Sequence, residues 1–437
     1  MRTGAAAFGA AIPIAIVAAI GLSRTPLRAD EQLVLAQARA VAADWRDTEG
    51  HRLPLYFHAH DSVWLQPSVV YASALWLKVA SPASPTSIRA MSVLVGALDA
   101  VLMYAVARRL FRREPMALVA AVSLGLAPAH FIYSRAAVDS LYPVPFVLAW
   151  LWCVVTFLAR PSPALLFAGG LCLGIGVGSH PTSVVMMPIF LAMTYVVLLR
   201  GGRASPASLA AAIAGFAVPM LVLGAWIARH PDAYLDTVGV FGPHPAHVRN
   251  PIDGVRAFLN WNTVTTRVTT YWSLLDPSWL FVGGPVLLLS QAPFVVAGVR
   301  RLAIAERGDQ ALLVLGGLVA APFAASAIDE RHAIGRALII LPFAALIAAY
   351  GVLELWSASR RWRGVAAALL VLMAIEFGVF ARGYLTNTAN DGVPSGSAAT
   401  AIRCSPPADR AASARPASAM ISVPAVRLPR SSDAGSE

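Results

Sequence analysis

The sequence is poor in charge. Of its 437 residues, only 13% are Asp, Glu, Lys or Arg, whereas soluble globular proteins carry roughly 25%. The chain is 57% hydrophobic, with a mean hydropathy of +0.65. Its apolar residues form repeated runs of roughly 20 residues, the length that crosses a bilayer as a helix. This composition excludes a soluble enzyme or binding domain and predicts a polytopic membrane protein.

Cysteine and lysine are also scarce. The three cysteines, Cys153, Cys172 and Cys404, have no spacing that suggests a disulfide framework or a metal site. Lys78 is the only lysine, so arginine carries the net charge of +11. The arginines cluster in short turns between apolar runs, as the positive-inside rule and contact with anionic lipids require. The charge therefore predicts membrane lipids as partners and excludes a nucleic-acid function.

About eleven apolar runs are predicted to span the membrane as helices. They lie near residues 3–22, 88–107, 116–133, 140–158, 164–180, 182–199, 208–227, 279–299, 310–327, 335–356 and 363–381. The first run is either a signal peptide or a spanning helix. Its long apolar core and the many spans that follow favour an uncleaved helix with a cytoplasmic N-terminus.

The arginines predict the orientation of these spans. With the N-terminus inside, every basic cluster falls on the cytoplasmic side of the membrane. The clusters are Arg108, Arg109, Arg112 and Arg113; Arg160; Arg200 and Arg203; Arg300, Arg301 and Arg307; and Arg360, Arg361 and Arg363. The periplasmic side then receives a first loop (23–87), a second large loop (228–278) and the turns at 134–139, 180–181 and 329–336. Polar residues far apart in sequence are thus expected to meet at the outer face of the membrane.

Two stretches outside the spans need separate interpretation. Residues 62–80 are apolar, but a span there would invert every later loop, so we predict an interfacial or re-entrant helix. Residues 385–437 are rich in Ser, Ala, Pro and Arg, which predicts a disordered tail after a membrane domain at 1–384. An alternative is that the tail is read in a shifted frame of a GC-rich gene.

Four stretches occur in an order that is familiar from one superfamily. They are the Asp30-Glu31 pair after the first span; Trp64–Tyr71 (WLQPSVVY); Ile88–Ser92 with Ala107–Phe111; and the turn Ser134–Asp139 with Gly178–Thr182 (GSHPT). Together they resemble the bacterial members of the protein O-mannosyltransferase and aminoarabinose-transferase superfamily. The family's second motif favours Lys-Pro-Pro where this chain has Gln66-Pro67, and many relatives have a lysine at the position of His180. The resemblance covers residues 1–384 and implies a GT-C-fold enzyme that takes sugar from a polyprenyl-phosphate carrier, without a metal cofactor.

Glycosyl transfer from such a carrier requires a carboxylate that deprotonates or orients the acceptor hydroxyl, and an apolar groove for the lipid. The predicted catalytic residues are Asp30, as this base, and Glu31, as its neighbour or as the residue that positions the donor or acceptor. The alternative is that both carboxylates only solvate the end of the first helix. Adjacent residues on a helix point about 100° apart, so the two are not expected to share one proton.

The departing phosphate must be held by cations or hydrogen-bond donors. The predicted donor-phosphate ligands are Arg135, His180, Arg331 and Arg336. A guanidinium can bind phosphate bidentately, whereas a neutral His180 would donate one hydrogen bond. Arg135 and Asp139 would pair as an i, i+4 ion pair if their turn were helical. Arg331 and Arg336 have the alternative role of anchoring the chain at lipid head groups.

The predicted acceptor or substrate contacts are His58, His60, Asp61 and Asp139. The H-x-H-D spacing of the first three also offers ligands to a metal. No other segment supplies a matching ligand, however, so we expect no metal and no other cofactor.

The sequence therefore predicts an all-α, GT-C-like membrane bundle that acts as an inverting hexosyl- or pentosyltransferase. Its donor would be a polyprenyl-phosphate sugar, and its acceptor a protein hydroxyl, lipid A or another glycan. One alternative is a transporter or flippase of lipid-linked sugars; another is a lipid-binding assembly subunit whose loops do no chemistry. Asp99 and Glu376 lie within apolar runs and receive no specific role.

Overall fold

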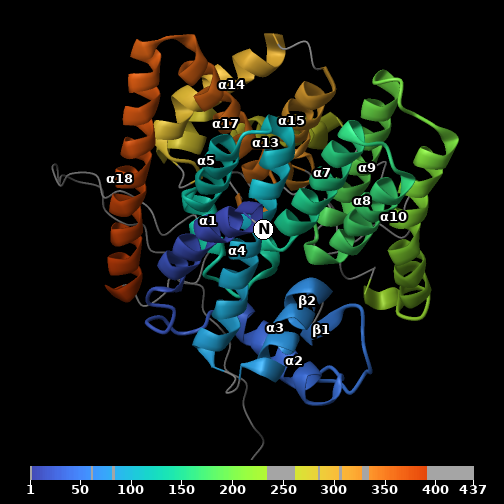
Figure 1. The fold of residues 1–437 in the computed structure, drawn as a ribbon. Coiled ribbons are helices and arrows are strands. Elements are labelled where there is room, and N and C mark those ends of the chain that lie inside the picture. Colours follow the sequence, from blue (N-terminus) through green and yellow to red (C-terminus); the bar gives the residue numbers. More distant parts are fainter. Residues whose placement is uncertain are drawn as a thin grey trace, which may run out of the picture. The chain divides into compact units, whose positions relative to one another are not determined.

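The computed structural model describes residues 2–60, 63–80, 84–233, 261–283, 286–304, 308–326 and 334–390. In these ranges the chain is helical almost throughout (Figure 1). The part before residue 234 contains α1 (Arg2–Ala19), α2 (Ala29–Asp44), β1 (Phe57–His60), β2 (Val63–Leu65), α3 (Pro67–Val79), α4 (Pro85–Phe111), α5 (Glu114–Gly125), α6 (Pro128–Tyr133), η1 (Asp139–Leu141), α7 (Pro143–Ala159), α8 (Pro163–Gly176), η2 (Val177–Ser179), α9 (Ser183–Arg200) and α10 (Pro206–Ile227). The later part contains α13 (Trp261–Leu275), η3 (Trp279–Gly283), η4 (Leu289–Gln291), α14 (Ala292–Ile304), α15 (Gly308–Ala320), α16 (Phe323–Ser326), η5 (Ile334–Arg336), α17 (Ile340–Ala358) and α18 (Arg360–Asn390).

The predicted all-α polytopic membrane fold is confirmed, with one small hairpin added. Within the described residues, seven helical stretches are long and apolar enough to cross a bilayer: Pro85–Phe111, Asp139–Ala159, Ser183–Arg200, Pro206–Ile227, Gly308–Ser326, Ile340–Ala358 and Arg360–Asn387. Three shorter apolar helices, at Ala6–Ala19, Glu114–Gly125 and Pro163–Ser179, coincide with further predicted spans. The span expected at 279–299 differs, because the chain there forms the short helices η3 and η4 before α14 begins at Ala292. α18 continues to Asn390, beyond the expected start of the tail at 385.

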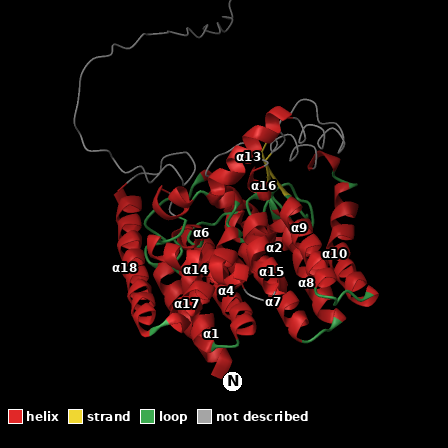
Figure 2. Cartoon of the chain, turned by 90° about the horizontal axis from the view of Figure 1, so that it is seen from above, coloured by secondary structure: helices red, strands yellow, loops and turns green. Residues whose placement is uncertain are grey.

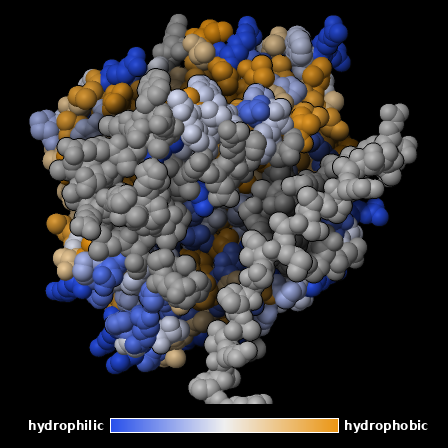
Figure 3. All heavy atoms as spheres, turned by 180° about the vertical axis from the view of Figure 1, so that it is seen from behind, coloured by the Kyte–Doolittle hydropathy of each residue, from blue (hydrophilic) through white to orange (hydrophobic). Residues whose placement is uncertain are grey.

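Large apolar side chains are exposed on the outside of these helices. Examples are Leu221 on α10, Val296 on α14 and Val379 on α18, each more than two-thirds exposed. Figure 3 shows hydrophobic side chains gathered over much of the described surface of one face. Exposed apolar area of this extent is a liability in water and is the surface expected against lipid.

Proline determines where many of these helices begin. It occupies one of the first two positions of α3, α4, α5, α6, α7, α8 and α10. At these positions its missing N–H costs no intrahelical hydrogen bond, and its fixed φ favours the first turn. Ser84 and Ser205 add side-chain caps to α4 and α10 by accepting backbone hydrogen bonds of 3.1 Å.

The first large loop is itself folded. α2 packs on α3, and between them β1 and β2 pair antiparallel, with His58 opposite Trp64. The buried Gln37 of α2 donates to the carbonyl of His58 at 2.7 Å and to Oγ1 of Thr48 at 2.8 Å, so it holds the hairpin on the helix. α3 falls where we predicted an interfacial helix, and its 13 residues are too few to cross a bilayer. Helix α2 and the hairpin were not predicted.

Several arginine-rich turns are joined to one another at one end of the helices. Arg203 forms an ion pair of 2.6 Å with Asp309, which links the α9–α10 turn to the start of α15. Arg301 pairs with Glu354 at 2.7 Å and links the ends of α14 and α17. Figure 2 shows the long helices side by side, with the start of α1 at one end and α13 and α16 at the other. This agrees with the predicted gathering of basic turns; the side of the membrane on which they lie remains a prediction.

Glu376, an acidic residue within the apolar helix α18, has a structural role. Its two carboxylate oxygens accept hydrogen bonds from the backbone N–H groups of Leu289 (2.6 Å) and Ser290 (2.9 Å). These groups lie at the N-terminus of η4, just before α14, where free N–H groups favour a negative charge. The carboxylate is thus turned inward to a partner, as is usual for charge in a membrane helix.

Helices α14 and α17 pack closely because each presents a glycine to the other. A Cβ on Gly298 would lie 1.9 Å from the carbonyl oxygen of Ile347, and a Cβ on Gly351 would lie 1.8 Å from that of Phe294. Small residues that permit close backbone approach are typical of helix pairs in membranes.

We therefore expect Gly351→Ala to lower thermal stability, because even one methyl group must separate the two backbones. Overpacking of this kind costs about 1–3 kcal/mol. Gly378→Ala on α18 is the matched control, since a Cβ there meets no atom within 4 Å. Melting temperatures in detergent measure the effect, and equal values for the two variants would contradict the close contact.

Candidate functional site

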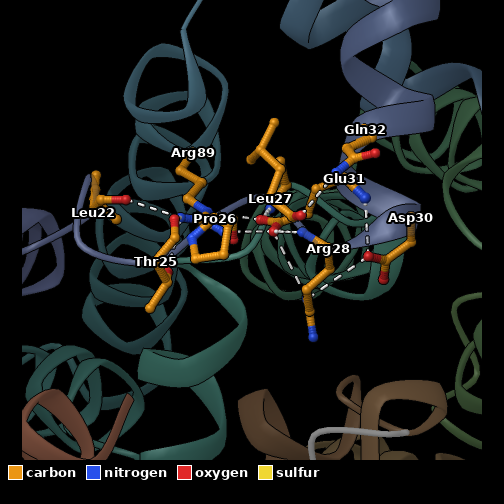
Figure 4. Close-up of polar contacts among 10 residues, drawn as sticks. Leu22, Thr25, Pro26, Leu27, Arg28, Asp30, Glu31, Gln32 and Arg89 are labelled. Carbon is orange, nitrogen blue, oxygen red and sulfur yellow. Dashed lines mark hydrogen bonds and ion pairs between the residues drawn. The ribbon is translucent and has the colours of Figure 1, made fainter. Parts of the chain in front are cut away.

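A buried ion pair organises the start of the first loop. Glu31 on α2 and Arg89 on α4 are only 1% and 5% exposed. Nε and Nη2 of Arg89 donate to the two carboxylate oxygens of Glu31 at 2.8 and 2.6 Å (Figure 4). The same guanidinium donates to the carbonyls of Leu22, Thr25 and Pro26, each at 2.9 Å. One arginine thus fixes the chain after α1, and the start of α2, against α4.

Glu31 has no free capacity for catalysis. It also accepts hydrogen bonds of 3.0 Å from the backbone N–H groups of Arg28 and Ala137, so each carboxylate oxygen has two donors. Burial raises the pKa of this carboxyl, but the hydrogen bonds from Arg89 and the two N–H groups outweigh it, and the net pKa is lowered. The structure therefore corrects the predicted catalytic role of Glu31: the side chain faces inward and acts as a structural anion.

Asp30 points in the opposite direction, on the far side of the turn from Arg89 (Figure 4). Its side chain is 55% exposed and lies 3.7 Å from Nε of Arg28. Its Oδ1 accepts a hydrogen bond of 2.9 Å from the N–H of Glu31 in the first turn of α2. The result is an accessible carboxylate on a rigid support, which is what a general base requires.

The turn between α6 and η1 separates two residues that were expected to pair. α6 ends at Tyr133 and η1 begins at Asp139, and the residues between them are not helical. Arg135 turns towards α1 and donates from Nη1 to the carbonyl of Ala18, with its guanidinium 5.1 Å from the ring centre of Phe131. The predicted Arg135–Asp139 ion pair is therefore wrong, because it assumed helical spacing. The phosphate-binding role of Arg135 stays a prediction, with one donor already used at the end of α1.

Asp139 faces His180 instead. Its Oδ1 lies 4.0 Å from Nε2 of His180, in the turn before α9. Asp139 also interacts electrostatically with Asp30 and with Arg336. Four predicted site residues thus come together from α2, η1, the turn before α9 and η5.

The turns that carry His180 and Arg336 are joined through Thr182. Its Oγ1 donates to the carbonyl of Arg336 at 3.3 Å. Burial lowers the pKa of His180; the nearby Asp139 raises it and the nearby Arg336 lowers it, and the net pKa is lowered. The imidazole is therefore neutral at physiological pH. Arg331, the other predicted arginine, lies outside the described residues.

His58 and His60 of the H-x-H-D stretch lie on β1. His58 forms a hydrogen bond of 2.6 Å through Nδ1 to Oε1 of Glu49, and its ring lies 5.0 Å from that of Trp64. Asp61 lies outside the described residues, and of His60 the structure describes only the backbone. A substrate contact by these residues remains a prediction.

A second group of potential ligands, which the sequence did not indicate, lies beside His58. Potential ligand atoms of Asp47, Glu49 and His51 all lie within 4.8 Å of one another. Oδ1 of Asp47 accepts from the N–H groups of Glu49 (3.0 Å) and His51 (2.7 Å), and its Oδ2 lies 3.0 Å from Nδ1 of His51. These bonds close the turn after α2 with the chain's own donors, which is a structural use of the buried carboxylate.

We therefore expect a chelator to leave activity unchanged. Incubation with EDTA, followed by transfer to metal-free buffer, should not alter the initial rate of donor turnover, because the turn is closed by hydrogen bonds. A loss of activity that added zinc or manganese restores would overturn the prediction that no metal is required.

Two buried residues in the interior were not assigned from sequence. Arg89 lies within a motif that carried the resemblance, and its position inside an apolar run was the signal that it needs a partner. Asp99 of α4 lies 3.4 Å from Nε2 of His130 of α6, and both are fully buried. This polar contact joins α4 to the helix that precedes the 134–139 turn.

Comparisons with known proteins agree with the fold. Residues 66–226 match the family model described as dolichyl-phosphate-mannose-protein mannosyltransferase. The fold is similar to that of ArnT from Cupriavidus metallidurans bound to undecaprenyl phosphate (TM-score 0.55, 12% identity, covering 87% of this chain and 73% of that one). It is also similar to AglB, an oligosaccharyltransferase from Archaeoglobus fulgidus, in complex with an inhibitory peptide and a dolichol-phosphate (TM-score 0.54, 14% identity, covering 87% of this chain and 56% of that one). No curated protein sequence matches the chain.

The structural matches confirm the predicted fold, and the family model supports the predicted resemblance over residues 66–226. The chain spans little more than half the length of the archaeal oligosaccharyltransferase, and 73% of the length of ArnT. The TM-scores of 0.54 and 0.55 show the shared fold. At identities of 12–14% substrates and activity require a separate argument.

Proposed function

We propose that this member of the GT-C glycosyltransferase superfamily moves a sugar from a polyprenyl-phosphate carrier to an acceptor hydroxyl at the periplasmic face of the inner membrane. The observation that carries the proposal is the accessible carboxylate of Asp30, on a helix that a buried ion pair holds in place. This carboxylate interacts electrostatically with Asp139, which also interacts with His180 and Arg336. The lipids bound in the structures of the relatives, undecaprenyl phosphate for ArnT and dolichol-phosphate for AglB, support the same class of carrier.

In the proposed reaction Asp30 acts as the base, or as the carboxylate that orients the acceptor. As the acceptor hydroxyl gives its proton to Asp30, its oxygen forms a bond to the anomeric carbon of the sugar. The bond from that carbon to the phosphate oxygen breaks, and the electron pair leaves with the polyprenyl phosphate. Attack opposite to the leaving group inverts the anomeric centre. A phosphate with a second pKa near 6 leaves without a strong general acid.

Arg336 and His180 are the proposed ligands of the departing phosphate, with Arg135 as a further candidate. Charge that develops on phosphate oxygens is stabilised by preorganised donors. Asp139 interacts electrostatically with Asp30 and with Arg336 and lies 4.0 Å from His180, and its carboxylate would contact the acceptor or sugar hydroxyls. Sugar and acceptor classes remain as predicted: a hexose or pentose, and a protein hydroxyl, lipid A or another glycan.

Purified protein in proteoliposomes tests the proposal. Given a polyprenyl-phosphate sugar and mixed hydroxyl acceptors, and with no ion gradient, it should release free polyprenyl phosphate. A protein that only moves the intact lipid-linked sugar across the bilayer, without releasing the carrier, would be a transporter and would contradict the proposal.

A further inference from the structure

The contacts of His180 fix which of its ring nitrogens carries a proton. Nδ1 accepts a hydrogen bond from the backbone N–H of Thr182 at a donor–acceptor distance of 3.2 Å, and Oγ1 of Thr182 lies 2.8 Å from the same nitrogen. A backbone amide can only donate, so Nδ1 must present its lone pair. In a neutral imidazole the proton then resides on Nε2. Nε2 is the atom that faces Asp139 at 4.0 Å.

Three features of the surroundings disfavour a second proton on this ring. His180 is buried, and burial penalises the charged form. The positive guanidinium of Arg336 acts on it from η5. His180 also lies three residues before the start of α9 at Ser183, whose N–H donates to the carbonyl of His180 at 2.9 Å, and a helix N-terminus disfavours positive charge. Among the described residues, the carboxylate of Asp139 acts in the opposite direction.

We propose that Thr182 is a positioning residue that holds His180 as a neutral imidazole with its proton on Nε2, and that His180 acts as a hydrogen-bond donor in the site rather than as a base or a cation. The inference rests on the proposed function, because the ligand of that donor is the phosphate of the lipid carrier. A neutral donor ahead of a helix N-terminus stabilises developing negative charge without itself changing charge.

The arrangement also couples two phosphate ligands. Oγ1 of Thr182 lies 2.8 Å from Nδ1 of His180 and 3.3 Å from the carbonyl oxygen of Arg336, and its single proton can be donated to either acceptor, one at a time. A change at Thr182 therefore affects the orientation of the imidazole and the placement of the η5 turn together. His180 has no free nitrogen with which to accept the acceptor's proton, which leaves that role to a carboxylate.

The protonation state is measured directly by ¹⁵N NMR of histidine-labelled protein in lipid nanodiscs. The chain has nine histidines, so the His180 signals are identified by their loss in His180→Gln. We expect an unprotonated Nδ1 and a protonated Nε2 at pH 7, and titration only below the ordinary imidazole value of about 6.5. A proton on Nδ1, or a doubly protonated ring at pH 7, would overturn the proposal.

Paired variants test the role of each nitrogen. The amide nitrogen of Gln reproduces the Nε2–H donor, whereas the shorter Asn side chain reaches only the Nδ1 position. We expect His180→Gln to keep most of the transfer rate and His180→Asn to lose about tenfold or more, as removal of one buried hydrogen bond to a charged group would. Equal rates in the two variants, whether high or low, would overturn the donor role.

Thr182 has its own matched pair. Thr182→Val removes the hydroxyl at constant shape and should slow transfer about fivefold, the effect of one lost hydrogen bond, and raise the pH at which His180 titrates. Thr182→Ser keeps the hydroxyl and should behave as the wild type in both measurements. A titration unchanged in Thr182→Val would contradict the positioning role. Absence of transfer by the wild type would instead refute the proposed function, while the NMR result would stand by itself.

Discussion

Asp30→Asn is expected to abolish sugar transfer while leaving expression, membrane insertion and thermal stability unchanged. Asparagine has the same shape, and its side-chain oxygen can still accept the 2.9 Å hydrogen bond from the N–H of Glu31. It cannot take a proton from the acceptor hydroxyl. Loss of a general base typically slows a reaction by about 10²–10⁴-fold, so turnover should fall below detection in an end-point assay.

The matched control for this variant is Asp44→Asn. Asp44 ends the same helix, α2, and its side chain is 60% exposed, close to the 55% of Asp30. We expect the control to retain full activity because its carboxylate has only a surface contact with Arg46. Normal turnover by Asp30→Asn would remove Asp30 from the mechanism. Equal loss in both variants would indicate a general effect of charge on α2.

Arg89→Met is expected to give the largest loss of stability of any single change described here. It leaves the carboxylate of Glu31 buried without its cation and frees the carbonyls of Leu22, Thr25 and Pro26. Removal of one partner of a buried ion pair costs about 3–5 kcal/mol. Because the same arginine fixes the start of α2, transfer should also fall in whatever fraction of the protein remains folded.

Two comparisons make this prediction specific. Arg46→Met breaks an exposed ion pair with Asp44 and should change stability by about 0–1 kcal/mol at most. Adding Glu31→Gln to Arg89→Met removes the unpaired charge and should restore part of the lost stability. Thermal melts of the variants supply the measurement. Equal melting temperatures for Arg89→Met and Arg46→Met would show that the Glu31–Arg89 ion pair contributes little to stability.

The same ion pair predicts a dependence of stability on pH. The pKa of Glu31 is lowered in the folded protein, so its contribution to stability is fully present above the unfolded pKa of about 4.3 and is lost as the pH falls through the folded value. Acidification below that range should therefore destabilise the wild type more than Glu31→Gln. If the melting temperatures of both proteins fell by the same amount between pH 7 and pH 3.5, this linkage would be contradicted.

The sequence predicted the part of the fold that depends on hydropathy and charge. The apolar runs and the arginine turns were sufficient for the helical membrane fold and for the convergence of Asp30, Asp139, His180 and Arg336. They did not predict α2 and the β1–β2 hairpin, because these elements are held by polar contacts such as those of Gln37. The span expected from 279 begins late for a related reason, since Glu376 of another helix caps the N-terminus of η4.

The roles of neighbouring charged residues could not be predicted because they depend on distant partners. Asp30 and Glu31 are equivalent in sequence, and only the contact with Arg89, 58 residues later, shows that Glu31 is the buried one. Arg135 and Asp139 were expected to pair on the assumption that the turn containing them is helical, but helix α6 already ends at Tyr133. His180 was expected as a neutral donor, but the residue that holds its tautomer, Thr182, became evident only from the turn geometry.

The central claim is that charged groups from separate elements form one site on one side of the membrane, and accessibility labelling tests it most directly. Asp30→Cys and Arg336→Cys would be introduced singly into a chain in which Cys153, Cys172 and Cys404 are replaced by serine or alanine. A membrane-impermeant thiol reagent added to intact cells or right-side-out vesicles should label both positions, and a polyprenyl phosphate should protect both. Labelling of one position from outside and of the other only after the membrane is opened would contradict the account.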